Sequence, residues 1–394
     1  MKIDTKNVNH WWLLIKQALF AAVAAAVRAI SHKPKKPIVI LYGHQFAGNL
    51  KSLYIEWQQH HRQDLDLYFL TLDPEQFVSL KAEGIQTLAC HRWKDMRTLA
   101  ISSIMVTDHG LHAMFPLIHI TDMKFIDVWH GIPFKGFVPE DFKLQHRYDE
   151  IWVPSERVKK LYSTRFGFAS KKLRSLGYAR TDKLFRKEIS ELGFREQFGL
   201  LPEQKIVLYA PTWRQKAHEP PPTPFGLTND DFIMHLGKIC AVHDALLVLR
   251  CHLNTLVKYD NQGGVLCVPQ KLYPDTEDIL LATDILVCDW SSISFDFAIL
   301  QRPTLFLDFP PPFHNGLSLG QEYRFGEIIK DIDDLTNAIT SYLIDPKIYE
   351  KKYSHKQDAT VKELYAKESI GRASRLQVER LIKLARIEKP NDIN

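Results

Sequence analysis

Cysteine is scarce and unpatterned in this sequence of 394 residues. The five cysteines are odd in number, no two of them show the CxxC spacing of zinc and redox sites, and most lie in apolar runs. In such runs a free cysteine behaves as a small hydrophobic residue. The pattern argues against a disulfide framework and against a zinc site, and it favours a reducing compartment.

Several nucleotide-binding and metal-binding motifs are also missing. The sequence has no Walker loop, no GxGxxG after its first predicted strand, and no acidic cluster that resembles a dedicated magnesium site. These absences disfavour ATP chemistry and dinucleotide redox chemistry. The interior has no long basic run and the net charge is only +5, so nucleic acid is not expected as a partner, whereas an anionic substrate or lipid is.

The N-terminus holds a long apolar run, WWLLIKQALFAAVAAAVRAI at residues 11–30. Its length suits a bilayer-spanning helix, but Lys16, Arg28 and the many alanines weaken its insertion. The run begins with two tryptophans of the interfacial type, and a basic cluster at residues 32–36 follows it. We expect a helix that lies on or dips into the inner leaflet. The alternative is an amphipathic helix docked on the folded domain, while a signal peptide is disfavoured because no small-residue cleavage site follows.

From residue 37 onward, short apolar runs alternate with helical segments in two series. We expect strands at residues 37–43, 66–73, 85–90, 103–110, 124–131 and 150–156, and then at 205–214, 245–254, 265–270, 285–290 and 303–310. Strands that are apolar throughout, rather than at alternate positions, are typical of parallel sheets covered on both faces. The sequence therefore predicts an α/β protein with two doubly wound, Rossmann-like domains.

The predicted organisation has four parts. We expect a membrane-associated helix and basic linker at residues 1–36, a first Rossmann-like domain at 37–190, a second at 191–345 and a helical C-terminal tail at 346–394. Ligands of such folds bind outside the carboxyl ends of the strands, here in a cleft between the two sheets. Reactive residues should therefore collect after strands.

Four strand ends carry such residues. These are WHGIPFK with His130, Gly131, Pro133 and Lys135; APTWR with Thr212 and Arg214; LRCHLN with Arg250 and His252; and CDWSSISFD with Asp289, Ser291, Ser292 and Asp296. Taken singly, each has a structural interpretation, such as a hydrogen-bonded turn histidine, a surface ion pair or a serine helix cap. Their coincidence on one predicted rim indicates a binding site instead.

The charge of this set indicates its ligand. The fork of Arg214 and the point charge of Lys135 complement each other, and the N–H groups at the start of a serine-capped helix bind anions. A phosphate or pyrophosphate is the natural ligand. We therefore expect transfer from a nucleotide-activated donor, with the enzyme positioning a diphosphate and neutralising the leaving nucleotide.

These motifs resemble those of the CDP-glycerol glycerophosphotransferase family. WHGIPFK is similar to that family's WHGTPLK, APTWR to its APTFR or APTWR, LRCHLN to its R-x-H-P element, and DILVCDWSSISFDFAILQRP to its D-x-L-I-T-D-Y-S-S-x-x-F-D block followed by K-R-P. The resemblance runs from about residue 37 to 330. The departures are Ile132, Phe134, Leu253 and Trp290. They are mostly apolar exchanges beside the reactive groups and leave the identity of donor and acceptor open.

The resemblance implies a GT-B-like fold, with the acceptor in the N-terminal half, the CDP donor in the C-terminal half and a membrane-bound acceptor. It implies that His130 is the general base, which takes the proton of an acceptor hydroxyl that attacks the β-phosphate and releases CMP. It further implies that His252 and Arg214 stabilise the phosphoryl group and that Ser291 and Ser292 hold the diphosphate. Asp289 would contact the ribose or a histidine, and Asp296 would orient the serine turn. The remaining candidates for contacts with the donor phosphates are Gly131, Pro133, Lys135, Thr212 and Arg250.

The implied function is the transfer of a polyol phosphate, glycerol phosphate first and ribitol phosphate second, from CDP-glycerol or CDP-ribitol to a lipid-linked or polymeric glycan. This reaction belongs to the synthesis of teichoic-acid-like polymers, capsules or surface glycans, on the cytoplasmic face of a bacterial membrane. No tightly bound cofactor and no protein metal site are expected, although Mg²⁺ can accompany the donor diphosphate. A GT-B glycosyltransferase with a nucleotide-sugar donor is the alternative, and a non-catalytic membrane scaffold is a third. The oligomeric state and the number of units added stay open.

Overall fold

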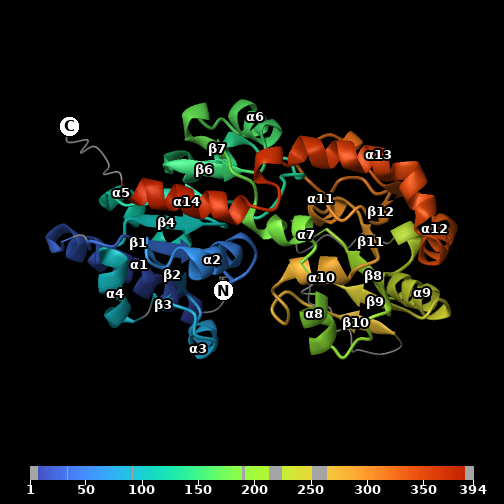
Figure 1. Cartoon of the computed structure of the whole chain (residues 1–394), viewed down its shortest axis with the longest axis horizontal. Helices are drawn as coiled ribbons and strands as arrows, with labels where there is room; N and C mark the ends of the chain where they lie inside the picture. The colour runs from blue at the N-terminus through green and yellow to red at the C-terminus, as the bar shows by residue number, and fades with distance from the viewer. Residues whose placement is uncertain are drawn as a thin grey trace. The chain divides into compact units, whose positions relative to one another are not determined.

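The computed structural model describes residues 8–386 except residues 33, 91, 189–190, 213–223 and 251–263. The chain forms two compact units (Figure 1). Unit 1 comprises residues 1–130, 139–182 and 368–394, and unit 2 comprises residues 131–138 and 183–367. The chain enters unit 2 briefly after His130 and returns to unit 1 at its C-terminal end.

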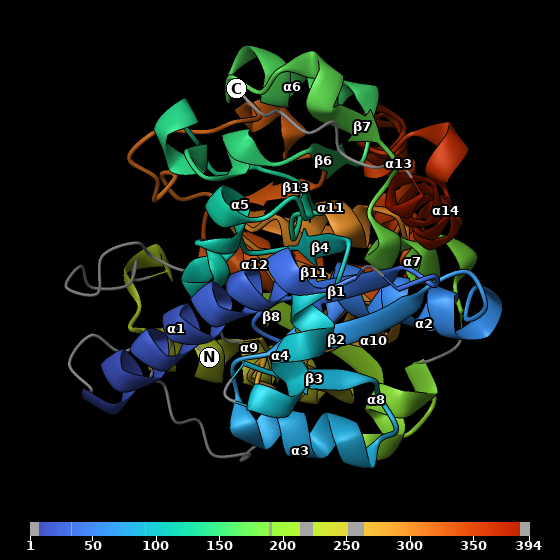
Figure 2. The same ribbon diagram turned by 90° about the vertical axis from the view of Figure 1, so that its left-hand side faces the viewer.

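Unit 1 is built on a parallel sheet with the strand order β3-β2-β1-β4-β5-β6-β7 within the described residues (Figures 1 and 2). The strands are β1 (Ile38–Tyr42), β2 (Asp66–Thr71), β3 (Thr87–Ala89), β4 (Ile104–Thr107), β5 (Lys124–Asp127), β6 (Glu150–Val153) and β7 (Leu173–Ser175). The order reverses between β1 and β4, which makes the carboxyl ends of these two strands the switch point of the sheet.

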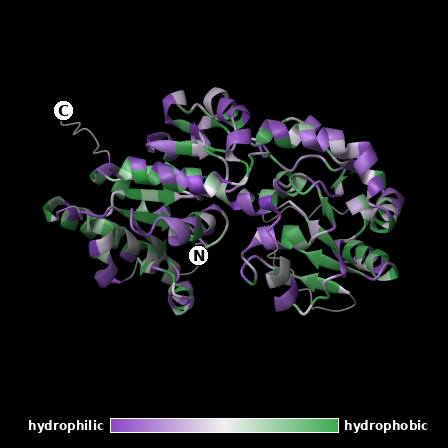
Figure 3. Ribbon diagram, in the orientation of Figure 1, coloured by the Kyte–Doolittle hydropathy of each residue, from purple (hydrophilic) through white to green (hydrophobic). Residues whose placement is uncertain are grey.

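Helices cover this sheet and bury its apolar strands. They are α1 (Val8–Ile30), α2 (Gly48–His60), α3 (Pro74–Ala82), α4 (Trp93–Ala100), α5 (Leu117–Ile120), α6 (Glu156–Thr164) and α14 (Ala373–Ala385). Trp57 of α2 and Leu381 of α14 pack on the sheet face that holds Val39 and Leu41. The strands of both units are hydrophobic over most of their length (Figure 3), as expected for parallel strands buried on both faces.

Unit 2 repeats this architecture with the strand order β10-β9-β8-β11-β12-β13 within the described residues, again parallel. The strands are β8 (Lys205–Ala210), β9 (Ala245–Leu249), β10 (Val265–Cys267), β11 (Ile285–Cys288), β12 (Thr304–Leu307) and β13 (Glu327–Ile329). The helices are α7 (Asp182–Arg186), α8 (Glu191–Gln197), α9 (Asn229–Val242), α10 (Thr276–Ala282), α11 (Ile293–Ala298), α12 (Ile332–Ile344) and α13 (Lys347–Leu364). The switch point lies between β8 and β11. Two parallel α/β units, each with its own core, confirm the predicted fold class.

The C-terminal segment is helical but is not a separate tail. Helix α13 belongs to unit 2, and α14 belongs to unit 1. Helix α14 returns because Val378 and Leu381 complete the hydrophobic core over the first sheet. Buried polar contacts add to this packing, since both carboxylate oxygens of Asp182 accept hydrogen bonds from the first turn of α14.

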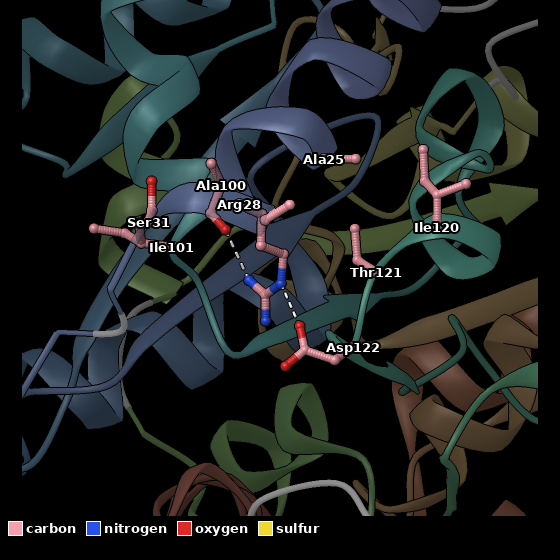
Figure 4. Close-up of a pocket in the computed structure, with 9 residues that line it drawn as sticks. Ala25, Arg28, Ser31, Ala100, Ile101, Ile120, Thr121 and Asp122 are labelled. Atoms are coloured by element: carbon pink, nitrogen blue, oxygen red, sulfur yellow. Dashed lines mark hydrogen bonds and ion pairs between the residues drawn. The ribbon is translucent and has the colours of Figure 1, made fainter. Parts of the chain in front are cut away.

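Helix α1 docks on unit 1 along one face. Phe20, Ala21 and Ala24 are buried, and α1 lies beside α4 (Figure 2). The guanidinium of Arg28 forms an ion pair with Asp122 and donates to the carbonyl oxygen of Ala100 at 2.8 Å, beside a pocket of about 260 Å³ (Figure 4). In the described part of the chain we find no helix with the length and hydropathy needed to span a bilayer. This face of α1 therefore fits the alternative interpretation, an amphipathic helix docked on the folded domain.

Candidate functional site

Four histidines come together at the switch point of unit 1. His44 follows β1, His109 and His112 follow β4, and His130 follows β5. The rings of His109 and His130 are stacked, with their centroids 4.1 Å apart and their planes at 8°. The ring of His44 lies 4.4 Å from that of His112 and 5.3 Å from that of His109. This is the edge of the sheet at which ligands of doubly wound folds bind.

The hydrogen bond of His130 defines its tautomer. Its Nδ1 lies 2.9 Å from the carbonyl oxygen of Asp108. A carbonyl can only accept, so Nδ1 carries the proton and Nε2 of the neutral ring keeps its lone pair. Desolvation by the surrounding protein lowers the pKa of His130 below its usual 6.5, and the neighbouring His109 lowers it further. Although the protein around it reduces its hydration, His130 keeps part of its surface accessible to solvent, so a neutral imidazole base is available to a ligand at pH 7.

The turn that carries His130 is held from three sides. Trp129 has a φ of 49°, in the left-handed region that a bulky residue rarely adopts. Its N–H donates to Oδ1 of Asp127 at 2.6 Å, and its carbonyl oxygen accepts from Nδ2 of Asn49 at 2.8 Å. The guanidinium of Arg180 donates to the carbonyl oxygen of His130. Such contacts maintain a strained backbone, which is common where a side chain must be aimed.

The burial of Asp127, beneath this turn, predicts that the stability of the protein depends on pH. Its side chain is almost fully buried, and desolvation raises its pKa from 3.8 to about 7. Between these two values the folded state keeps a proton that the unfolded state releases, so the free energy of unfolding falls as the pH rises toward 7 and then levels off. Asp127→Asn keeps the oxygen that Trp129 uses but cannot ionise. We expect it to stabilise the protein by about 1 to 4 kcal/mol at pH 8 and by far less at pH 4.5.

Urea denaturation of the wild type and of Asp127→Asn at both pH values measures this difference. Asp358→Asn is the matched control, because Asp358 is exposed on α13. Its effect should be small at either pH. An Asp127→Asn variant whose stability follows that of the wild type from pH 4.5 to 8 would show that this carboxyl is not the buried titrating group described here.

The switch point of unit 2 holds a second set of predicted site residues. Thr212 follows β8, and Asp289 follows β11. The backbone N–H of Thr212 donates to Oδ1 of Asp289 at 2.8 Å, and the threonine hydroxyl donates to the same oxygen. Desolvation raises the pKa of the buried Asp289, and the two bonds from Thr212 oppose this shift. The structure therefore brings Thr212 and Asp289 together, with the carboxylate fixing the turn that leads out of β8.

The WHGIPFK motif is divided between the units. His130 belongs to unit 1, whereas Gly131–Val138, with Gly131, Pro133 and Lys135, belongs to unit 2. Phe134 packs against Trp290 and Phe295, with ring centroids 5.4 Å and 5.0 Å away. Gly136 donates its N–H to the carbonyl oxygen of Gly316 at 2.7 Å. A Cβ at Gly136 would lie 2.1 Å from the carbonyl oxygen of Asn315, so this close approach requires glycine.

Ser291 and Ser292 lie before α11 in unit 2 and are half-buried. Ser292 occupies the N-cap position, but its side chain makes no capping hydrogen bond, which corrects the expected serine cap. The carbonyl oxygen of Ser291 accepts instead from the N–H of Ser294 at 3.2 Å. Helix α11 has only six residues. The expected binding of phosphate therefore depends on the hydroxyl groups of Ser291 and Ser292 rather than on the dipole of a long helix, and it stays a prediction.

Two of the predicted site residues have internal partners in unit 2. The guanidinium of Arg250 is buried and donates to the carbonyl oxygens of Tyr273 and Val268 at 2.7 and 3.2 Å. It also donates to the hydroxyl of Thr276 at 2.9 Å. The carboxylate of Asp296 is buried and accepts from the hydroxyl of Tyr365 at 2.9 Å. These contacts give Arg250 and Asp296 structural roles, the first after β9 and the second at the contact of α11 with the chain after α13.

His252 and Arg214 lie outside the described residues, so their roles stay predictions. Sequence reasoning missed His44, His109 and His112. The signal for His109 and His112 was present in TDHGLH, but the expected strand at 103–110 ran through the aspartate and the first histidine, whereas β4 ends at Thr107. Within the residues that the structure describes, no group of three or more His, Cys, Asp or Glu side chains is arranged to hold a metal ion.

Comparisons with known proteins identify the family of this chain. A family model described as CDP-glycerol:poly(glycerophosphate) glycerophosphotransferase matches residues 25–382. The teichoic acid poly(glycerol phosphate) polymerase of Bacillus spizizenii is 24% identical over 372 residues, which cover 86% of this chain and 89% of that protein. The teichoic acid glycerol-phosphate primase of Bacillus subtilis is 26% identical over 298 residues, which cover 70% and 74%.

Among solved structures, that of the wall teichoic acid polymerase TagF matches with a TM-score of 0.69 and 19% identity, and the match covers 96% of this chain and 98% of that one. This likeness concerns the fold, and it agrees with the two parallel α/β units. The family model, by contrast, spans both switch points and all four motifs. The chain belongs to the CDP-glycerol:poly(glycerophosphate) glycerophosphotransferase family.

Proposed function

We propose that this protein transfers a polyol phosphate, glycerol phosphate first, from a CDP-activated donor to a hydroxyl of a teichoic-acid-like acceptor and releases CMP. The observation that carries the proposal is His130. A neutral imidazole whose Nδ1 proton is donated to a backbone carbonyl stands at the carboxyl end of β5, in the WHGIPFK stretch that resembles the family's WHGTPLK and lies within the residues that the family model matches. A general base is what the activation of an acceptor hydroxyl requires.

The proposed reaction is a single displacement. Nε2 of His130 accepts the proton of the acceptor hydroxyl, and the acceptor oxygen forms a bond to the β-phosphorus of the donor. The bond from this phosphorus to the bridging oxygen breaks, and its electron pair leaves with CMP. The protein contributes position and charge rather than a covalent intermediate.

Unit 2 supplies the proposed donor site. Lys135, Thr212, Ser291 and Ser292 belong to this unit, and all but Lys135 follow strands β8 and β11 at its switch point. Arg214 and His252 would add charge to the phosphoryl group, and Mg²⁺ can accompany the diphosphate. That these groups meet His130 in one site stays a prediction.

A donor panel tests the proposal. We expect CMP to be released from CDP-glycerol, or from CDP-ribitol, when the protein is incubated with the donor and a bacterial lipid extract. UDP-sugars should be left intact, because the family motifs mark a polyol-phosphate transferase. Chromatography of the nucleotides over time measures both. Release of UDP from a UDP-sugar, with CDP-polyols untouched, would favour the glycosyltransferase alternative.

The proposal extends to the acceptor and to the cellular location of the protein. We infer that the acceptor is lipid-linked or polymeric and that the protein works at the cytoplasmic face of the membrane, held there by α1. The exposed face of α1 carries Val8, Trp11, Trp12, Ile15, Leu19, Val23 and Ile30. These positions recur at helical spacing, opposite the docked residues Phe20 and Ala24. An apolar helix face with two tryptophans suits the membrane interface.

Charge near the end of α1 supports this placement. A pocket of about 540 Å³ is lined by Arg28 and by the linker that follows α1. Its charged lining residues are Arg28, Lys35, Lys36, Lys124 and Arg386, against Asp64 and Asp122. Five cations against two carboxylates leave an excess of positive charge, which anionic lipid headgroups would attract.

A further inference from the structure

The histidine cluster of unit 1 contains more chemistry than the proposed reaction uses. We propose that His109 is the positioning residue of His130, a second imidazole held as a cation by Asp108 and stacked on the ring of the base. This inference rests on the proposed function, because it assigns His109 a role through His130. It concerns only groups within unit 1.

The geometry links the two rings through one residue. Nδ1 of His109 lies 2.9 Å from Oδ1 of Asp108, and Nδ1 of His130 lies 2.9 Å from the backbone carbonyl oxygen of the same Asp108. The rings are stacked at 4.1 Å and 8°. Asp108 thus contacts both imidazoles, pairing its carboxylate with the ring of His109 and accepting a hydrogen bond from His130 through its backbone carbonyl.

The neighbouring strand leaves room for this carboxylate. Gly43 directly follows β1, and a Cβ built on it would lie 2.7 Å from Oδ1 of Asp108. Only glycine permits this approach without a shift of the carboxylate. The Asp108–His109 pair is therefore built into the switch point, where β1 and β4 separate.

The surroundings favour a charge on His109 and on no other ring of the cluster. The titratable or charged groups that face it are Asp108, His112, His44, Asp127, His130 and Arg180. Desolvation and Arg180 oppose the charge, but the charge of Asp108 and its side-chain contact outweigh them, with Asp127 adding to the effect only where it is ionised, so the pKa of His109 is raised. Desolvation and the neighbouring imidazoles lower the pKa values of His44 and His112.

A cation stacked on His130 opposes a second positive charge there. Like charges within about 4 to 6 Å disfavour each other, which lowers the pKa of His130 and keeps Nε2 unprotonated in weakly acidic solution. At the same time the stack holds the plane of the base. His109 therefore has two expected effects on His130: it extends the pH range of the base toward acid, and it holds the orientation of the ring. A residue that only packed against His130 would not shift the pH range in this direction.

The test compares His109→Phe, which keeps a flat ring without charge, with His109→Gln, which loses both. We expect the acid limb of the pH–kcat profile to move to higher pH by about one unit or more in both variants, because the pKa of His130 moves back toward 6.5. The loss of kcat should be about tenfold greater at pH 5.5 than at pH 8. Asp108→Asn, which keeps the backbone carbonyl, removes the attraction of Asp108 for a charge on His130 together with the charge it holds on His109, so it should shift the profile less than His109→Phe does.

Two further measurements keep the outcome interpretable. The pKa of His130, followed by NMR of its Cε1 proton, should rise in His109→Phe, and this readout needs no turnover. His60→Gln, at an exposed histidine at the end of α2, should leave profile and pKa as in the wild type. A uniform loss of kcat at every pH, with an unchanged pKa of His130, would overturn the inference. If His130→Ala also retained full transfer, the proposed function itself would fail.

Discussion

Replacing His130 by alanine will lower kcat for CMP release by about 10²- to 10⁴-fold, the usual contribution of a general base. The expected loss is in kcat rather than in the KM for the donor, because the proposed donor contacts belong to unit 2. The fold should survive. His130 is exposed, and its turn is held by Asp127, Asn49 and Arg180 through contacts to backbone atoms, and these do not involve the imidazole.

The control for this variant is His119→Ala, which removes an exposed histidine from α5 in the same unit. Both variants should keep the wild-type circular dichroism spectrum and denaturation midpoint, and only His130→Ala should lose transfer. Single-turnover measurements with excess enzyme separate a slow chemical step from slow product release. Transfer by His130→Ala at the wild-type rate from every CDP-polyol would remove His130 from the mechanism.

The fold was predictable because its strands are continuous apolar runs. Val39 and Leu41 of β1, and Val207 and Tyr209 of β8, are buried on one face of their sheets, and the intervening residues are buried on the other. The strands β7 and β13 escaped prediction because they are three residues long and polar at Arg174 and Glu327. The edge strands β3 and β10 are equally short but were predicted, because they lie in apolar runs.

The division of the chain was not predictable in the same way. Gly131–Val138 belongs to unit 2 because Phe134 packs on Trp290 and because Gly136 meets the backbone at Asn315, contacts between segments far apart in the sequence. Local periodicity cannot reveal such pairs. Helix α14 is a similar case, since its amphipathic pattern indicates a helix but not the sheet on which it packs.

The candidate site was predictable to the extent that side chains follow strands. His130, Thr212 and Asp289 lie where this rule places them, at the carboxyl ends of β5, β8 and β11. Arg250 also follows a strand, but its guanidinium donates hydrogen bonds to backbone carbonyl oxygens. An arginine at a strand end thus serves a ligand or the fold according to which acceptors are near, and only the tertiary structure supplies that information.

The two switch points share one arrangement. In each unit the residue or turn after the central strand, Gly43 after β1 and Thr212 after β8, contacts an aspartate after the neighbouring strand, Asp108 or Asp289. In unit 1 this carboxylate is paired with the ring of His109, and in unit 2 it holds the turn at Thr212. Each aspartate therefore has its partner within its own unit.

Charging the exposed face of α1 will remove the protein from membranes. Trp12 and Leu19 are 58% and 56% exposed on the face opposite the docked one. In Trp12→Glu/Leu19→Glu we expect binding to vesicles of phosphatidylglycerol and phosphatidylcholine to weaken at least about tenfold, because the apolar area that would enter the interface becomes charged. Sedimentation with vesicles measures the bound fraction, and transfer to a soluble acceptor should stay near the wild-type rate.

Substitution is a cleaner test than removal of α1. Phe20, Ala21 and Ala24 close the surface of unit 1, and Arg28 binds the carbonyl oxygen of Ala100, so a truncated chain would expose core. The matched control is Val242→Glu/Ile344→Glu, which charges two exposed apolar residues of unit 2. The control should bind vesicles as the wild type does. Equal sedimentation of all three proteins would show that α1 is not the membrane contact, whereas weaker binding of the wild type to pure phosphatidylcholine would identify anionic headgroups as part of the attraction.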